Sequence, residues 1–352
     1  MKYHEYDMVV VGSGPAGASA ARRACMHGIA TLLVDARKNP GSPVQCAEYV
    51  PYAIKKYVPL VPKAVVQKID TLITFIYNEP VSTLAGPGYM LDRTIFDGSL
   101  VQSAREAGAD FWPASQAISR TDEGLIVNRA GKGNVEIKCK IVIGADGPRS
   151  TVGQWMNSVN SSFMVGLQYN LPLCNNQSST DIYFQPEYEG GYGWVFPKGK
   201  NANVGIGVNL LHKNKLRYLI KNFIDGLIAQ GKLADFRPTR ITGGLIPVGG
   251  PLAVTQKKNM LLAGDAAGHT HPVTGGGIMN AIVTGQMAGE WAAQAIINHD
   301  LKLLAHYPQQ WQTFLGRYLD RAVQQRKDMD DNWTYNPQQF KNLIKRTWMG
   351  FN

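Results

Sequence analysis

The chain has 352 residues, of which 44% are hydrophobic and 18% are charged, and this composition is that of a folded globular protein rather than a disordered one. The length allows one large domain or two interleaved domains. The formal net charge of +10 implies attraction to anions, such as dinucleotide phosphates, an anionic substrate head group or acidic lipid, and a solvated basic surface explains the charge equally well. No basic motif with interleaved aromatic residues is present, which disfavours a nucleic-acid partner.

The N-terminal sequence and the cysteine spacing indicate where the protein is located and whether it holds a metal or disulfides. Few residues separate Met1 from the first apolar segment, so we expect no cleavable signal peptide, and no apolar stretch reaches membrane-spanning length. The expected location is the cytoplasm, and contact with the inner membrane surface stays open. The four cysteines, Cys25, Cys46, Cys139 and Cys174, are scattered without CxxC spacing. This spacing argues against a zinc site and a disulfide scaffold, and we expect no metal.

The first motif lies near the N-terminus. An apolar, β-branched strand from Asp7 to Val11 leads into Gly-Ser-Gly-Pro-Ala-Gly at residues 12–17. Gly12 permits a tight turn, Gly14 lets the backbone approach a pyrophosphate, and Gly17 allows close packing of helix and strand. The N-terminus of the following helix supplies free N–H groups and a partial positive charge. The motif therefore predicts dinucleotide binding.

The elements after this motif complete the unit. A helix is expected over residues 18–26, and a second strand over residues 30–34 ends in Asp35. Asp35 has the position of a ribose-binding carboxylate and favours an unphosphorylated ribose, as in FAD or NAD. Further along, Arg93 stands at the start of a helical segment that includes residues 98–107.

The middle of the chain is rich in strand signals. Residues 111–143 read as β-structure, with turn signals at 121–124 and 130–133. The last strand runs into Gly-Ala-Asp-Gly at 144–147, where the backbone must pass close to another group. Ser150 is placed to begin the next helix.

The second half contains the candidate substrate domain. Residues 163–208 alternate in polarity and are aromatic, which predicts an antiparallel sheet. An amphipathic helix is expected over 213–230. A short strand over 259–263 ends in Gly264-Asp265, and a glycine-rich loop then leads into a small-residue helix over 278–297.

The order of the glycine and acid signatures predicts the fold class. The signatures at 12–17, 144–147 and 264–268 occur in the order that an FAD-binding fold needs. We expect an α/β fold with a Rossmann-like FAD-binding domain, of the glutathione-reductase βαβ type, interleaved with an antiparallel-sheet substrate domain. The expected boundaries are 1–65, 90–160 and 240–300 for the FAD-binding domain, 66–89 and 161–239 for the substrate domain, and 301–352 for a C-terminal helical segment.

Three longer blocks carry a family resemblance. They are Leu-Asp-Arg-Thr-Ile-Phe-Asp at 91–97, Tyr-Gly-Trp-Val-Phe-Pro at 192–197, and Gly-Asp-Ala-Ala-Gly at 264–268 with Pro-Val-Thr-Gly-Gly-Gly-Ile at 272–278. With them the chain resembles the geranylgeranyl reductase family, within the flavoproteins shaped like para-hydroxybenzoate hydroxylase, from Tyr6 to about Ile297. The resemblance implies an FAD-dependent oxidoreductase that reduces C=C bonds of an isoprenoid chain by hydride transfer. The electron donor is left open between ferredoxin and NAD(P)H, because no second nicotinamide-binding fingerprint is visible.

The resemblance also implies cofactor contacts. Asp265 follows a strand and can accept hydrogen bonds from the ribityl chain, while the amides of Gly277 and Ile278 begin a helix whose positive end favours a reduced, anionic flavin. The family contacts carried over are Ala16, Asp35, Cys46, Ala47, Arg93, Ala117, Asp265, Gly277 and Ile278, and we add the motif residues Gly12, Gly14, Pro15, Gly17, Ala36, Arg37, Asp146, Gly264 and Gly276.

Three residues are candidates for catalysis. Cys46 matches a cysteine that lies near the flavin in archaeal members, although the family often has glycine next and this chain has Ala47-Glu48. Packing of Cys46 in a loop is an equally good interpretation. Tyr192 and Trp194 either line an apolar substrate tunnel or fill the core.

Two histidines invite a metal interpretation. His269 and His271 form an HxH sequence, but no third ligand accompanies them. We expect loop residues near the flavin, with a proton-donor role open.

Two other classes of function remain. A flavin monooxygenase that hydroxylates an aromatic small molecule or a peptide side chain would share the fold, but hydroxylases usually carry histidine directly after GDAA and this chain has Gly268. Halogenases are disfavoured because the WxWxI motif is absent. A non-catalytic flavoprotein with a protein partner is the third class. Its docking surface would be the basic tail at 341–351, for which a solvated helix is the simpler explanation. Separately, the chain is shorter than many members of the family, which leaves the length of an isoprenoid substrate open.

Overall fold

The computed structural model describes residues 4–351, which form two compact units. Unit 1 contains the described part of Met1–Ser42, together with Arg93–Ser161 and Gly249–Asp320. Unit 2 contains Pro43–Asp92, Ser162–Val248 and the described part of Arg321–Asn352. Each unit is thus assembled from segments that are distant in the sequence, and the domain boundaries expected from the sequence stay a prediction.

A parallel sheet forms the centre of unit 1. Its strands follow the order β16-β9-β1-β2-β6, and the short β15 extends the edge antiparallel to β16. The central strands read as continuous apolar runs, because both of their faces are covered; all four residues of β2, for example, are buried. The bounds are β1 (His4–Val11), β2 (Thr31–Val34), β6 (Asp110–Trp112), β9 (Gly133–Gly144), β15 (Gln256–Lys257) and β16 (Met260–Leu262).

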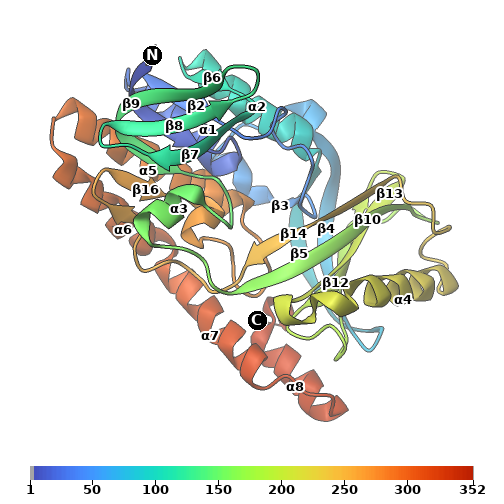
Figure 1. Ribbon diagram of the computed structural model, residues 1–352. Coiled ribbons are helices and arrows are strands. Elements are labelled where there is room, and N and C mark those ends of the chain that lie inside the picture. The colour runs from blue at the N-terminus through green and yellow to red at the C-terminus, as the bar shows by residue number, and fades with distance from the viewer. Residues whose placement is uncertain (1–3, 352) are drawn as a thin grey trace. The chain divides into compact units, whose positions relative to one another are not determined.

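An antiparallel meander continues from the same sheet. β7 (Ser115–Arg120) pairs with β8 (Gly124–Arg129), and β8 pairs with the first half of β9. Figure 1 shows β7, β8 and β9 as neighbouring arrows in green tones. The strands and turns expected between residues 111 and 143 are confirmed.

The helices of unit 1 pack closely enough to require small residues. A Cβ atom on Gly285 would lie 2.1 Å from the carbonyl oxygen of Ala16, and one on Gly289 would lie 2.3 Å from that of Ala20. The stripe of small residues on α5 therefore lets it lie directly against α1. The bounds are α1 (Pro15–Cys25), α2 (Arg93–Glu106), α3 (Thr151–Met156), α5 (Ile278–Ile297), α6 (His306–Trp311) and α7 (Arg317–Asp331), the last of which continues into unit 2.

Unit 2 is built on an eight-stranded sheet with the order β14-β10-β13-β12-β11-β4-β5-β3. Figure 1 shows α4 (Leu216–Ala229), in yellow, beside β10 and β13, and its apolar face joins the core of this unit. The bounds are β3 (Tyr49–Pro51), β4 (Val65–Ile76), β5 (Glu79–Leu91), β10 (Phe163–Pro172), β11 (Ser179–Phe184), β12 (Tyr192–Lys198), β13 (Asn201–Asn209) and β14 (Arg240–Pro247).

The antiparallel sheet expected over residues 163–208 is confirmed, and one of its strands also forms a parallel pair with a strand outside that range. β11 runs parallel to β4, with Ser179 opposite Thr71 and Phe184 opposite Ile76. These two strands are separated by a long stretch of chain that includes a segment of unit 1. No hairpin turn therefore fixes their relative direction, and strand periodicity carries no information about it.

Helix boundaries differ modestly from the sequence expectations. The first helix begins at Pro15 rather than residue 18, since proline suits the first helical position. α2 begins at Arg93, and the helix expected from 213 starts as a 3₁₀ turn over Leu210–Lys215. The helix expected at 278–297 is confirmed as α5.

The C-terminal segment is amphipathic. In α8 (Pro337–Thr347), Phe340, Leu343 and Ile344 are buried, whereas Lys341 and Lys345 are exposed. Of the helices within residues 4–351, none is sufficiently long and apolar to cross a membrane. All four cysteines are free thiols.

Candidate dinucleotide and substrate sites

In unit 1 the carboxyl ends of the parallel strands are in register. Val11 lies opposite Val34 on one side and Gly144 on the other, and Leu262 also lies opposite Gly144. The three glycine and acid signatures therefore emerge side by side, although long stretches of sequence separate them. The carboxyl edge of a parallel sheet is where open α/β folds bind ligands.

The first signature forms a tight turn against the second. Gly12 has φ +100°, and a Cβ atom on it would lie 2.3 Å from the carbonyl oxygen of Ala145. A Cβ atom on Gly17 would lie 1.8 Å from the carbonyl oxygen of Gly12. By contrast, no atom lies within 4 Å of the Cβ position of Gly14. Gly12 and Gly17 thus serve close packing, while Gly14 leaves open space over the turn.

The N-terminus of α1 has no side-chain cap. Gly14 is the N-cap residue and Pro15 follows it, so no capping oxygen takes the N–H groups of Ala16 and Gly17. Such N–H groups bind anions together with the positive end of the helix dipole. The open space over Gly14 adjoins these groups, and the arrangement fits the pyrophosphate of a dinucleotide.

Asp35 is fixed beside this turn. Its Oδ2 accepts hydrogen bonds from the backbone N–H and the hydroxyl of Ser13, both at 2.7 Å. Its Oδ1 accepts one from the backbone N–H of Arg37, also at 2.7 Å. Ala36 lies between these residues, and the carboxylate is held where strand β2 ends. Its contact with a ribose stays a prediction.

Asp146 is engaged by the protein itself. Its carboxylate accepts hydrogen bonds from the hydroxyl of Ser150 at 2.5 Å and from the backbone N–H groups of Thr151 at 2.6 Å and Val152 at 3.3 Å. Ser150 in turn caps α3 through the N–H of Gly153. The expected helix start at Ser150 is confirmed, and the carboxylate of Asp146 stabilises that start.

The third signature contributes a second uncapped helix. Gly277 is the N-cap residue of α5 and makes no side-chain cap, which leaves the first amides of the helix, beginning at Ile278, without a capping oxygen. Thr270 donates a hydrogen bond of 2.6 Å to Asp265. Burial raises the pKa of Asp265, while this hydroxyl and the charge of Arg93 oppose the shift. One polar cluster therefore contains Asp265, Arg93 and the start of α5. Gly264 directly precedes Asp265 in the chain, and Gly276 directly precedes the N-cap residue of α5.

The histidines of this loop are neutral. Burial lowers the pKa of His269 to about 3 and that of His271 to about 4. His269 packs against Trp311, and within the described residues its two ring nitrogens have no hydrogen-bond partner. His271 Nδ1 accepts a hydrogen bond from the N–H of Thr274. Among residues 4–351, no group of three or more His, Cys, Asp or Glu side chains could hold a metal ion.

Unit 2 contains the three expected catalytic residues: Tyr192 and Trp194 lie on β12, and Cys46 lies in a loop that is hydrogen-bonded to the same sheet. Trp194 Nε1 donates a hydrogen bond of 2.8 Å to Gln168 Oε1, and Gln168 Nε2 donates one of 3.1 Å to the carbonyl oxygen of Cys46. The ring of Tyr192 lies 6.1 Å from that of Trp194 in an edge contact. Burial, and to a smaller extent Cys46, raises the pKa of Tyr192, so its hydroxyl stays protonated at neutral pH.

Glycines make the space for the indole of Trp194. A Cβ atom on Gly205 would lie 2.2 Å from that ring, and one on Gly166 would lie 3.5 Å from it. Trp194 is 7% exposed. Both interpretations of this residue, as core and as a substrate contact, are compatible with this burial.

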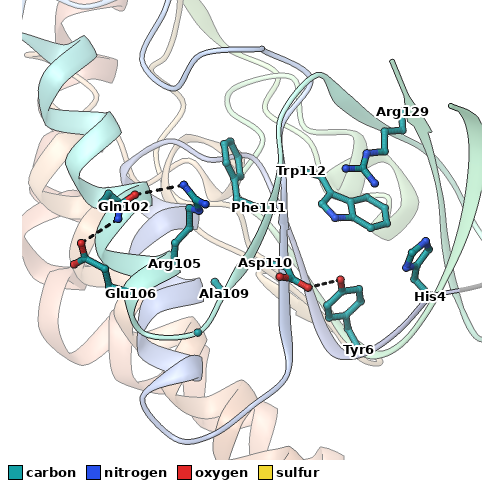
Figure 2. A pocket seen from close by; sticks show the side chains of 11 residues that line it. His4, Tyr6, Gln102, Arg105, Glu106, Ala109, Asp110, Phe111, Trp112 and Arg129 are labelled. Carbon is teal, nitrogen blue, oxygen red and sulfur yellow. Dashed lines mark hydrogen bonds between the residues drawn. The ribbon is translucent and has the colours of Figure 1, made fainter. Parts of the chain in front are cut away.

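A hollow of about 710 Å³ lies in unit 1 (Figure 2). The Tyr6 hydroxyl donates to Asp110 at 2.7 Å, and the guanidinium of Arg129 lies 4.2 Å from the centre of the Trp112 ring. Tyr6 lies six residues before Gly12 along β1 and the following turn. At about 3.3 Å per residue this is roughly 20 Å, so the hollow lies far from the glycine turn. None of the site residues expected from the sequence lines this hollow.

The sequence-predicted residues therefore divide between the two units. Cys46, Ala47, Tyr192 and Trp194 belong to unit 2, and the other expected contacts belong to unit 1, where Ala117 is buried in the core. Their roles stay predictions. Sequence reasoning missed the hydrogen-bonding residues Ser13, Thr270 and Gln168. Ser13 and Thr270 lie inside recognised motifs and could have been found there, whereas Gln168 carries no sequence signal.

Comparisons with known proteins agree with this geometry. Residues 163–243 match the geranylgeranyl reductase catalytic domain, and residues 10–57 match an NAD(P)-binding Rossmann-like domain. The digeranylgeranylglycerophospholipid reductase 1 of Methanococcoides burtonii is 34% identical over 336 residues, which cover 89% of this chain and 81% of that protein.

Solved structures show the same relationship. A geranylgeranyl bacteriochlorophyll reductase-like protein from Thermoplasma acidophilum superimposes with a TM-score of 0.88 at 26% identity, over 99% of this chain and 97% of the other. The myxobacterial chondrochloren halogenase, described as an FAD-dependent enzyme, gives a TM-score of 0.76 at 17% identity, over 99% and 91% of the two chains, and this likeness shows the fold alone. The chain belongs to the geranylgeranyl reductase family.

Proposed function

We propose that the protein is an FAD-dependent reductase that saturates C=C bonds in the isoprenoid chains of a lipid. The observation that carries this proposal is the match of residues 163–243, which include Tyr192 and Trp194, to the geranylgeranyl reductase catalytic domain. The dinucleotide edge of unit 1 by itself does not distinguish a reductase from a halogenase or a monooxygenase. The relative at 34% identity is named for an isoprenoid lipid, and this supports the substrate class.

The residues of unit 1 fit FAD. The uncapped N-terminus of α1, beside the open space over Gly14, would hold the pyrophosphate. Asp35 would accept hydrogen bonds from the ribose of the adenosine, and Asp265 from the ribityl chain. The first amides of α5 would direct the positive end of a helix at the flavin. When bound and reduced, the cofactor supplies a hydride to one alkene carbon.

The residues of unit 2 would orient the alkene and exclude water. Trp194 and Tyr192 offer large apolar surfaces, and the hydrogen bond to Gln168 fixes the plane of the indole. The protonated hydroxyl of Tyr192 would not compete as a base. We infer that the proton for the second alkene carbon comes from a nearby acid or from water.

The proposal is tested with chemically reduced enzyme. The purified protein is reduced without oxygen and mixed with digeranylgeranyl phospholipid, and flavin absorbance and product mass are followed. The expected result is reoxidation by the lipid with a gain of two hydrogens for each bond reduced. Oxygen consumption that depends on an added aromatic compound and yields its hydroxylated product, with no turnover of the lipid, would instead establish a monooxygenase.

The partners follow from the same chemistry. We infer that the enzyme meets its substrate at the cytoplasmic surface of a membrane, because an isoprenoid lipid partitions into the bilayer and the net charge of +10 is attracted to anionic head groups. Co-sedimentation with anionic vesicles, but not with zwitterionic ones, is the expected result. Reduced ferredoxin and NAD(P)H are both candidate electron donors, and the rate of flavin reduction by each decides between them.

A further inference from the structure

The segment Gln45–Glu48 is attached to the sheet of unit 2 at successive residues. Gln45 Nε2 donates a hydrogen bond of 2.9 Å to the carbonyl oxygen of Gly243. The carbonyl oxygen of Cys46 accepts one from Gln168 at 3.1 Å, and that of Ala47 accepts one from Asn203 at 3.1 Å. We call this stretch the Cys46 segment. Side chains from β10 and β13 therefore hold two of its backbone carbonyls, and its own Gln45 side chain binds the backbone of β14.

Glu48 makes the strongest of these attachments. Its side chain is fully buried, and its Oε2 accepts hydrogen bonds from Lys198 Nζ at 2.7 Å, Asn203 Nδ2 at 2.8 Å and Arg240 Nη2 at 2.9 Å. A buried carboxylate is tolerated only when it is paired and hydrogen-bonded. Lys198 and Arg240, with side chains 13% and 35% exposed, provide two cations for one anion.

The backbone of Glu48 is unusual as well. Its φ of +74° lies in the left-handed region, which is unfavourable for a residue with a Cβ atom. In this conformation its N–H donates a hydrogen bond of 3.2 Å to Cys46 Sγ. The contacts of the carboxylate therefore maintain a backbone conformation that local preference opposes, and this conformation directs an N–H at the thiol.

We propose that Glu48 is a positioning residue for Cys46. The buried carboxylate fixes the Cys46 segment on the sheet, sets the left-handed turn and so directs the N–H of Glu48 at the Cys46 thiol. The catalytic relevance of this position rests on the proposed function, whereas the positioning itself is a property of unit 2. The sheet supplies the three partners from β12, β13 and β14.

Thiol reactivity tests the positioning without any turnover. Cys174 is exposed, whereas Cys25 and Cys139 are buried, so the FAD-loaded Cys174→Ser protein reports mainly on Cys46 when it reacts with the aromatic disulfide DTNB. Glu48→Gln in this background removes the charge but keeps the side-chain shape. We expect the Cys46 reaction to accelerate at least tenfold, because the segment leaves the sheet more often.

A matched control removes a different buried carboxylate from the same sheet. Asp181, which is 4% exposed at its side chain, pairs with Lys232 at 3.3 Å, and its side-chain hydrogen bonds within the described residues go to Ser179, Tyr183 and Lys232 rather than to the Cys46 segment. Asp181→Asn is expected to lower thermal stability while leaving the DTNB rate of Cys46 within twofold of the reference. Equal acceleration by both variants would mean general loosening of unit 2 and would overturn the proposal.

Further variants separate the carboxylate from the backbone. Glu48→Gly relieves the left-handed conformation but deletes the carboxylate, so it is also expected to accelerate the reaction; an unchanged rate would show that only the turn matters. Arg240→Gln removes one of the three partners of the Glu48 carboxylate and is the milder variant to use if Glu48→Gln does not fold. It should accelerate the reaction about threefold. An unchanged DTNB rate in Arg240→Gln and Glu48→Gln overturns the proposal.

The reductase assay distinguishes this proposal from the proposed function. Loss of positioning is expected to lower kcat for lipid reduction more than it raises KM, because binding surface remains while orientation is lost. If the parent protein reduces no lipid, the proposed function fails, and the thiol measurements still decide the role of Glu48.

Discussion

Substitutions at two glycines of the first turn separate cofactor binding from folding. In Gly17→Ala the new methyl would lie 1.8 Å from the carbonyl oxygen of Gly12. An ordinary C···O contact is about 3.3 Å, so the chain must shift by roughly 1.5 Å. Overpacking of this kind costs about 1–3 kcal/mol or more. We expect the flavin-free Gly17→Ala protein to lose at least that much stability and to bind FAD poorly.

Gly14→Ala makes the opposite prediction for stability. No atom lies within 4 Å of its Cβ position, and its φ of −67° suits alanine. Alanine is a weaker N-cap than glycine, which destabilises the fold, but it lowers the entropy of the unfolded chain, which stabilises the fold. The net change in the free energy of unfolding is therefore about 1 kcal/mol or less. The methyl occupies the space proposed for the pyrophosphate, so Kd for FAD should rise at least about tenfold, or ~1.4 kcal/mol.

The assay combines urea unfolding of the flavin-free proteins with FAD titration followed by flavin fluorescence. Gly98→Ala is the control, since its Cβ position is equally open and it lies within α2, away from the turn. Wild-type FAD affinity in Gly14→Ala would refute the assignment of this space to the pyrophosphate. Full stability in Gly17→Ala would refute the argument from close packing.

Three other substitutions test the remaining features. Asp35→Asn should weaken FAD binding by about 1.5–3 kcal/mol, because a charged hydrogen-bond acceptor is lost, and equilibrium titration measures this. The folded-state pKa values of His269 and His271, about 3 and about 4, lie below the unfolded value of 6.5, so the unfolded chain binds more protons below pH 6.5. The free energy of unfolding should therefore fall as the pH drops from 6.5 to 4, by up to about 1.4 kcal/mol per pH unit for each histidine. Urea titrations should show that the double variant His269→Phe, His271→Phe loses most of this pH dependence. Gly205→Ala would place a methyl 2.2 Å from Trp194, and lipid reduction should fall at least about tenfold with FAD affinity unchanged; equal activity would contradict a role for the indole.

The dinucleotide half of the protein could be predicted largely from the sequence. Gly12 and Gly17 stand where only a hydrogen atom fits, and such requirements are local to a strand, a turn and a helix. The parallel strands are readable because burial on both faces gives continuous apolar runs. The order of the three signatures predicted the FAD-binding fold, whereas the register that aligns Val11 with Gly144 and places the signatures on one carboxyl edge is a tertiary fact.

Other features were decided only by the tertiary structure. The parallel pairing of β11 with β4 depends on where a returning chain inserts, and the capping role of Asp146 depends on the start of α3. Glu48 reads in the sequence as one acidic residue among many. Its burial becomes tolerable because β12, β13 and β14 bring Lys198, Asn203 and Arg240 to the same oxygen. Sequence patterns report local backbone and burial requirements, whereas partners contributed by separate strands are specified only when the sheet assembles.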